Sequence, residues 1–315
     1  MKSQFRLDIE NGLKNSPKTL PSKYFYDAIG DALFVKIMHL PEYYLTRAEF
    51  EIFSTKSKNI ISKLEINKDQ PFDLIELGAG DGKKTKAFLK VLLDEDYNFK
   101  YLPIDISQNA LDDLEQSIHK EFSKLNIETI QGNYFGVLND IKTNTTPKVI
   151  MFLGSNLGNL QDHEAQDFLI KLSNALQVGD KVIMGLDTIK PKDVVLPAYN
   201  DSQGVTKAFN LNLLNRINNE LEADFEIENF DHSPEYNEET GIAKSYLVSK
   251  EDQEVTFNGD NIIFKFQKGE KILTEISRKY NDEILNSFLN NTKLKQISKI
   301  SDSKNYFNSY ILERV

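Results

Sequence analysis

The chain has 315 residues, of which 40% are hydrophobic and 27% charged, a composition that fits a globular protein of two domains or one enlarged α/β domain. A formal net charge of −10 argues against a nucleic-acid partner, because binding to phosphates requires clustered Lys and Arg. The sequence contains no cysteine, and its four histidines are scattered. It therefore offers no disulfide, no thiol nucleophile and no pair of metal ligands.

The hydropathy pattern predicts a protein of the cytoplasm. The amino terminus lacks the apolar core of a secretory signal, and no apolar run approaches the ~18 residues needed to cross a bilayer. We therefore expect a cytoplasmic protein without a membrane or nucleic-acid partner, acting on a small molecule. A monomer is also expected, although no sequence pattern specifies the oligomeric state.

The most informative segment runs from Phe72 to Gly82, where an apolar strand leads into three glycines at alternate positions. Glycine allows the chain to bend at Gly78 and a ligand to approach the backbone at Gly80. A helix can pack closely after Gly82. The pattern predicts the nucleotide-binding turn of an α/β enzyme.

The spacing of the glycines excludes two common nucleotide motifs. A dinucleotide fingerprint needs its third glycine where Lys83 stands, and a phosphate loop needs Ser or Thr where Lys84 stands. The pattern that remains is E-x-G-x-G-x-G, beginning at Glu76. It resembles the first motif of S-adenosylmethionine-dependent methyltransferases.

The segments after this turn alternate between helix and strand patterns. The expected strands are 99–106, 127–131, 149–153 and 181–186, and the expected helices follow the glycine turn and cover 108–122 and 161–176. Such alternation predicts right-handed βαβ crossovers and a parallel, doubly wound α/β sheet.

The alternation of helix and strand patterns ends at about residue 188. A long helix, 203–221, precedes short alternating segments that resemble a β-meander, and a helix with two closing strands ends the chain. The segments are 243–248, 261–266 and 271–276, followed by 282–289, 293–297 and 306–312. Class I methyltransferases resemble this, since their Rossmann-like sheet ends in an antiparallel hairpin. We predict one domain in 49–187 and 280–315, and an α+β domain in 1–48 and 188–279.

In a doubly wound sheet the ligand lies across the carboxyl ends of the strands. Asp105 closes the second strand and can hold ribose hydroxyls; the alternative is a helix N-cap or a surface Asp. Asn133 and Tyr134 follow the third strand after Gly132. They can offer an amide and a ring to adenine, and the alternative is an ordinary Gly-Asn turn.

Two further segments carry polar residues suited to a methyl acceptor. The loop from Gly154 to Asn159 follows the fourth strand, and its amides can hold a carboxylate or an amine without adding a competing nucleophile. Glu275 and Ser277 share a face of a predicted strand, where they can grip a ring with two nitrogens. From the pattern alone, the solvent face of an edge strand is the favoured alternative for this pair.

Several longer motifs point to one family. They are Leu20 to Asp27, Leu33-Phe34, Leu40 to Arg47, Glu76 to Gly80 with Lys84-Thr85, Phe152 to Ser155 with Gly158-Asn159, Ala198 to Asp201 with Gly204 to Thr206, and Thr274 to Ser277. Over nearly the whole chain they resemble the histidine Nα-methyltransferases of ergothioneine biosynthesis. The resemblance implies methylation of the α-amine of L-histidine, three times, to the betaine hercynine. It implies S-adenosyl-L-methionine as the cofactor and no metal.

The resemblance also assigns site residues. Those implied to bind S-adenosylmethionine are Gly78, Gly80, Lys84, Asp105, Asn133 and Tyr134. Those implied to bind the substrate are Tyr43, Gly154, Asn156, Asn159, Tyr199, Ser245, Glu275 and Ser277, with Tyr26 and Asn159 as candidate catalytic residues. In this assignment Glu275 and Ser277 grip the imidazole, which reverses the preference from pattern alone. The domain formed by 1–48 and 188–279 becomes the substrate-binding domain.

Three positions depart from the family pattern. Asn133 stands where the family commonly has Asp, Asn156 replaces a Thr near the amine, and Ser245 replaces a Met of the side-chain pocket. The last two leave open the same chemistry on another amino acid or an aromatic amine. A catalytically silent S-adenosylmethionine-binding module also stays open, and a nicotinamide dehydrogenase is less favoured by the glycine spacing.

Overall fold

The computed structural model describes residues 3–142, 144–258 and 262–315. The chain forms two compact units. Unit 1 contains the residues up to Tyr44 together with Lys190–Arg278, and unit 2 contains Leu45–Ile189 and Lys279–Val315. The domain boundaries predicted from the sequence lie after residues 48, 187 and 279, and those between the two units lie after residues 44, 189 and 278. None of the helices in the described ranges is long and apolar enough to cross a membrane.

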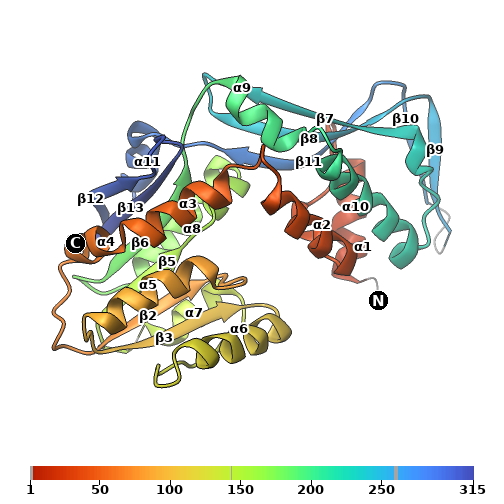
Figure 1. The fold of residues 1–315 in the computed structure, drawn as a ribbon. Coiled ribbons are helices and arrows are strands. Elements are labelled where there is room, and N and C mark those ends of the chain that lie inside the picture. The colour runs from red at the N-terminus through yellow and green to blue at the C-terminus, as the bar shows by residue number, and fades with distance from the viewer. Residues whose placement is uncertain (1–2, 143, 259–261) are drawn as a thin grey trace. The chain divides into compact units, whose positions relative to one another are not determined.

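Unit 2 is built on a seven-stranded sheet, which in its described residues has the order β12-β13-β6-β5-β2-β3-β4 (Figure 1). The strands are β2 (Phe72–Leu77), β3 (Phe99–Asp105), β4 (Ile130–Gln131), β5 (Lys148–Phe152), β6 (Lys181–Asp187), β12 (Leu294–Ser301) and β13 (Phe307–Arg314). The first five are parallel, and β13 runs antiparallel to both β6 and β12. The predicted doubly wound sheet with a closing antiparallel hairpin is confirmed.

Helices cover both faces of this sheet and enclose two apolar cores. One core includes α7 (Tyr134–Ile141), α8 (Asp162–Ala175) and α11 (Asp282–Leu289). The other includes α3 (Leu45–Thr55), α4 (Ser57–Leu64), α5 (Lys83–Asp94) and α6 (Gln108–Glu121). The sequence did not predict α7, because a helix of eight residues that includes Gly136 gives too short an apolar period.

Unit 1 contains a four-stranded sheet in the order β1-β11-β8-β7 and a separate hairpin of β9 and β10. The strands are β1 (Lys18–Thr19), β7 (Phe230–Asn237), β8 (Ile242–Ser249), β9 (Gln253–Phe257), β10 (Ile262–Phe266) and β11 (Lys271–Arg278). The expected meander is therefore wrong at one step, because β11 pairs with β8 and not with β10. The β9–β10 hairpin instead buries Phe257 and Phe266 in the core of this unit.

The helices of unit 1 cover this sheet and complete its core. They are α1 (Gln4–Lys14), α2 (Ala28–His39), α9 (Lys192–Val195) and α10 (Val205–Leu221), with the 3₁₀ turns η1 (Ser22–Phe25), η3 (Leu196–Tyr199) and η4 (Ile227–Asn229). The predicted stripe of α10 is buried at Phe209, Leu213 and Ile217. The Asp201 carboxylate accepts the N–H groups of Val205 and Thr206 in the first turn of α10, the latter at 2.7 Å, which fixes where this helix begins.

Candidate functional site

The glycine turn after β2 has the backbone that its sequence predicts. Gly78, Gly80 and Gly82 all have positive φ, at 78°, 55° and 65°. A Cβ at Gly78 would lie 2.5 Å from the Tyr134 hydroxyl, and one at Gly82 would lie 2.3 Å from Leu114 Cδ1. A Cβ at Gly80 would meet nothing within 4 Å. Gly78 and Gly82 thus allow close packing of neighbouring side chains, and Gly80 leaves free space beside the backbone.

Glu76, the last acidic residue of β2, supports this turn from inside the core. Its buried carboxylate accepts hydrogen bonds from the Thr85 hydroxyl, at 2.7 and 2.8 Å, and from the Tyr101 hydroxyl at 2.5 Å. Burial raises the pKa of Glu76 to about 7, against the lowering effect of these donors. Because Thr85 lies in α5, the contact fixes the start of this helix relative to β2.

Asp105 lies at the carboxyl end of β3, where a ribose-binding carboxylate is expected. Its Oδ1 accepts the N–H of Ser107 at 3.0 Å, and its carbonyl oxygen accepts the N–H of Gly132 at 3.0 Å. Ser107, and not Asp105, is the N-cap of α6. The interpretation of Asp105 as a helix cap is therefore wrong.

Asn133 and Tyr134 begin α7 beside the glycine turn. Asn133 is the N-cap of this helix, and its side chain accepts the N–H of Gly136 at 2.8 Å. Tyr134 packs edge-on against Phe152, with ring centroids 6.0 Å apart. Burial, and after it the charge of Asp105, raises the pKa of Tyr134 to about 12, so this phenol stays protonated and can donate. Asn133 thus has a structural role in addition to any role at a ligand.

The loop after β5 brings a second set of predicted residues close to the glycine turn. Gly154 and Ser155 both have positive φ, at 76° and 58°, and the 3₁₀ turn η2 (Asn156–Asn159) follows. The Asn156 side chain lies 3.7 Å from the Cβ position of Gly154, and its Nδ2 lies 3.9 Å from that of Gly78. Asn159, on the same turn, is exposed. We call residues 154–159 the acceptor loop.

Lys84, at the start of α5, forms an ion pair that the sequence did not predict. Its partner is Glu49 of α3, whose carboxylate also accepts the N–H of Gly154 at 2.9 and 3.0 Å. The side chain of Glu49 is 1% exposed and that of Lys84 is 23% exposed. The helical pattern does not distinguish Glu49 from a solvent-facing Glu. The one sequence signal for a role at the site was its proximity to the Leu40 to Arg47 motif.

A β-bulge in β11 orients the predicted imidazole-binding residues of unit 1. The pairing of β11 with β8 shifts register between Leu273 and Glu275, so that Glu275 lies opposite Ser245. The Thr274 hydroxyl lies 2.9 Å from Asn210 Oδ1 of α10 and 3.0 Å from the carbonyl oxygen of Ser245. Bulges re-aim side chains in this way. The pairing of β11 with β1 covers Ile272 and Leu273, so Glu275 lies beyond it and is paired on the β8 side. Its side chain is half-buried, and its assignment to the substrate stays a prediction.

The side chains around Glu275 are polar and aromatic. The Tyr199 hydroxyl donates to Ser277 Oγ at 2.8 Å in a buried contact. Tyr26 packs edge-on against Phe209, with centroids 5.8 Å apart, and its pKa is raised by desolvation and then by the charge of Glu275. In the described part of the chain, the buried Ser245 Oγ has no hydrogen-bond partner. We call Tyr26, Tyr199, Ser245, Glu275 and Ser277 the β11 cluster.

Tyr43, the remaining predicted substrate residue, packs edge-on against Phe34 of α2 with centroids 6.3 Å apart. Phe34 also packs against Tyr26 at 5.5 Å, so Tyr43 lies one ring away from the β11 cluster. Each predicted site residue therefore falls in one of two neighbourhoods, the glycine turn with the acceptor loop in unit 2, or the surroundings of Glu275 in unit 1.

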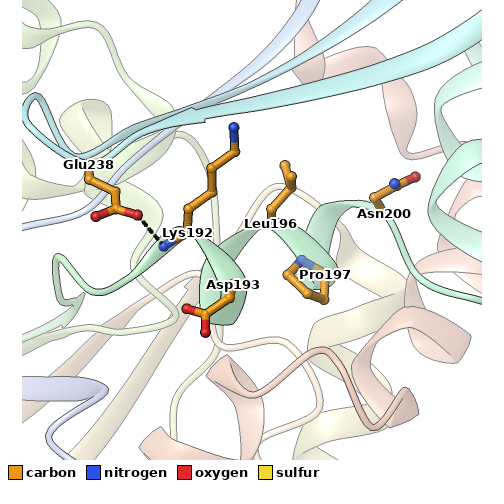
Figure 2. Close-up of a pocket in the computed structure, with 6 residues that line it drawn as sticks. All are labelled: Lys192, Asp193, Leu196, Pro197, Asn200 and Glu238. Atoms are coloured by element: carbon orange, nitrogen blue, oxygen red, sulfur yellow. Dashed lines mark hydrogen bonds between the residues drawn. The ribbon is translucent and has the colours of Figure 1, made fainter.

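A separate pocket of about 490 Å³ lies on unit 1 (Figure 2). Figure 2 shows Lys192, Asp193, Leu196, Pro197, Asn200 and Glu238 around it, and the Lys192 N–H donates to Glu238 Oε1 at 2.6 Å. It adjoins η3, which ends at Tyr199. None of the predicted site residues lines it, and we do not assign the active site to it.

The sheet topology and the glycine turn define the class of protein, an S-adenosylmethionine-dependent methyltransferase. Residues 5–314 match the family described as "Histidine-specific methyltransferase, SAM-dependent". The chain belongs to this family.

Curated relatives agree with this membership. The chain is 35% identical to the histidine N-alpha-methyltransferase of Mycolicibacterium smegmatis, over 88% of this chain and 85% of that protein. It is 34% identical to the protein of the same name from Mycobacterium tuberculosis, over 90% and 87%. Ergothioneine biosynthesis protein 1 of Schizosaccharomyces pombe is 27% identical over 97% of this chain, which spans 40% of that longer protein.

Proposed function

We propose that this enzyme methylates the α-amine of L-histidine and continues to the trimethylated betaine, hercynine. Membership of the histidine-specific family supports the reaction. The observation that carries the choice of acceptor is the β11 cluster, where a carboxylate and hydroxyl groups lie on one side of β11 and β8. The half-buried carboxylate of Glu275 lies opposite Ser245, whose buried hydroxyl has no partner among the described residues. This pair favours a ring with N–H groups over an apolar one.

The residues of unit 2 fit S-adenosylmethionine, which when bound supplies the methyl group and the sulfonium leaving group. The free space beside Gly80 suits a ligand pressed against the backbone, and Gly78 lets the Tyr134 hydroxyl approach the turn. Asp105 would accept hydrogen bonds from the ribose hydroxyls, while Asn133 and Tyr134 would contact adenine. Lys84 is a cation and would pair with the cofactor's only anionic group, its carboxylate.

The acceptor would be held at both of its ends. We assign Tyr43, Tyr199 and Asn159 to the carboxylate, with Gly154 and Asn156 nearby in the acceptor loop. We assign Ser245, Glu275 and Ser277 to the imidazole. A buried hydroxyl without a partner costs about 1–3 kcal/mol, so the Ser245 side chain gains most from a polar ring.

The chemical task of the protein is alignment and proton handling. Correct positioning can contribute ~7–11 kcal/mol to lowering the barrier. The acceptor amine must be neutral to attack; α-amines titrate near ~8, so a fraction is neutral at physiological pH. Tyr26, whose pKa is raised, remains a phenol. It would pass the released proton on through its hydroxyl and would not act as a phenolate base.

A panel of amino acids incubated with the enzyme and S-adenosylmethionine, followed by mass spectrometry, tests the acceptor. We expect histidine to gain methyl groups fastest. Faster reaction of tryptophan or another amine would instead favour the different acceptor suggested by Asn156 and Ser245. Cofactor binding in titration calorimetry without turnover of any acceptor would indicate a silent binding module.

The monomeric state and the cytoplasmic location stay predictions. The net charge of −10 supports the absence of a nucleic-acid partner. Light scattering coupled to gel filtration measures the oligomeric state directly, and a mass near 36.1 kDa is expected.

A further inference from the structure

Glu49 has a buried carboxylate that the roles assigned so far do not use. It projects from α3 and is 1% exposed at its side chain. Its oxygens accept the Gly154 N–H at 2.9 and 3.0 Å, and Oε2 pairs with Lys84. One carboxylate therefore contacts a predicted cofactor residue and the first residue of the acceptor loop.

The neighbouring strand leaves room for this carboxylate. A Cβ at Gly185 of β6 would lie 2.1 Å from Glu49 Oε1, so the side chain fits only because residue 185 is glycine. The Gly185 carbonyl oxygen accepts the N–H of Ser155 at 3.1 Å, and Ser155 Oγ accepts the N–H of Asp187 at 3.0 Å. The start of the acceptor loop is thus held from two sides, by β6 and by Glu49.

We propose that Glu49 is a positioning residue that couples Lys84 to the acceptor loop. Lys84 has three N–H donors, and one contact with Glu49 leaves two for the carboxylate of the cofactor. The same Glu49 carboxylate fixes the Gly154 amide and hence the backbone that leads to Asn156 and Asn159. The part of this inference that concerns the acceptor rests on the proposed function, and the part that concerns Lys84 does not.

Two substitutions separate these contacts. Glu49→Gln keeps an oxygen that can accept the Gly154 N–H but loses the charge that pairs with Lys84. Glu49→Ala loses both contacts. We expect both variants to raise the Kd for S-adenosylhomocysteine, measured by titration calorimetry, about 5- to 20-fold. Only Glu49→Ala should also raise the KM for histidine, by at least about fivefold, because only this variant frees Gly154.

A double-mutant cycle tests whether Glu49 acts through Lys84. In a Lys84→Met background, Glu49→Gln should change the Kd for S-adenosylhomocysteine by less than about twofold. If the fold-changes in Kd caused by Lys84→Met and by Glu49→Gln multiply in the double variant, the two residues act independently and the proposal is wrong. An unchanged or lowered Kd in a folded Glu49→Gln protein would also contradict the proposal.

Glu51 offers a matched control on the same helix. Its carboxylate accepts the Ser303 N–H at 2.7 Å and the Ser303 hydroxyl at 3.0 Å, but no predicted site residue is involved. Glu51→Gln should lower the melting temperature and leave the Kd and the KM within about twofold of wild type. If it raises the Kd as much as Glu49→Gln does, the effect is general destabilisation and the proposal is wrong.

If removal of the buried charge prevents folding, Glu49→Asp retains the charge but withdraws the carboxylate by one methylene. We expect the Kd for S-adenosylhomocysteine to rise at least about threefold, and an unchanged Kd would overturn the role. Failure of the wild-type enzyme to methylate histidine would contradict the proposed function alone, since the cofactor measurements do not depend on the acceptor.

Discussion

At the scale of single residues, the β11 cluster shows how environment determines the use of ordinary side chains. The cluster consists of residue types that are common on strands, among them Glu275, Ser277 and Ser245. The bulge sets Glu275 opposite Ser245, and the Tyr199 hydroxyl bonds to Ser277. A carboxylate that faces an imidazole N–H contributes ~1.5–3 kcal/mol through a charge-assisted hydrogen bond.

We predict that Glu275→Ala raises the KM for histidine about 10- to 100-fold with a smaller effect on kcat. Steady-state kinetics at saturating S-adenosylmethionine measures both. Glu235→Ala, which removes an exposed carboxylate of β7 in the same sheet, is the control and should behave as wild type. Unchanged histidine kinetics in Glu275→Ala would remove this residue from the acceptor site.

Asn159 is expected to behave differently, because it would hold the carboxylate end next to the reacting amine. We predict that Asn159→Ala lowers kcat as well as raising the KM for histidine, since misalignment by about 1 Å can cost 10²-fold in rate. A change in KM alone would show that Asn159 binds the acceptor without aligning it.

At the scale of elements, the sequence predicted β2, the glycine turn and α11 well, since each has a strong local pattern. It did not predict the bulge in β11, where Thr274 contacts Asn210 of α10, 64 positions away in the sequence. Nor did it predict the pairing of β1 with β11, since a strand of two residues has no period. The role of Glu49 was missed for the same reason, because its partners are distant in sequence.

The bulge supplies a prediction for Thr274. Thr274→Val removes the hydroxyl and leaves Asn210 Oδ1 buried without this donor, at a cost of about 1–3 kcal/mol of stability. We expect the KM for histidine to rise while the Kd for S-adenosylhomocysteine stays within about twofold. Thr256→Val, on β9, is the control. A raised cofactor Kd in Thr274→Val would show that the substitution disturbs more than the bulge.

At the scale of the whole molecule, each unit has a side-chain contact between residues close to the points where the chain passes from one unit to the other. Lys279 forms a fully buried ion pair with Asp187 at 2.8 Å in unit 2. Lys190 donates to the Tyr44 hydroxyl at 3.0 Å in unit 1. From the sequence, a domain boundary was predicted near residue 188, where the alternation of helix and strand patterns ends. The assignment of the cofactor to one unit and of the substrate to the other stays a prediction.

The stability of unit 2 should depend on pH through Glu76. Its pKa rises from 4.5 to about 7 on folding, so the native state binds the proton more tightly than the unfolded state. The contribution of Glu76 to stability is therefore full below pH ~4.5 and is lost as the pH rises to ~7, a change of ~3 kcal/mol.

We predict that Glu76→Gln loses less stability than wild type between pH 5 and pH 8. Urea unfolding followed by circular dichroism at both pH values gives the free energies of unfolding. The free energy of unfolding of wild type minus that of Glu76→Gln should be smaller at pH 8 than at pH 5. A difference independent of pH would show that Glu76 keeps an ordinary pKa in the folded protein.

The central claim is methyl transfer to the α-nitrogen of histidine. Incubation with S-adenosylmethionine and L-histidine, followed over time by mass spectrometry with fragmentation, tests it most directly. We predict successive mono-, di- and trimethylated products with every methyl group on the α-nitrogen. Unmodified histidine in the presence of bound cofactor, or methyl groups on the imidazole ring, would contradict the account.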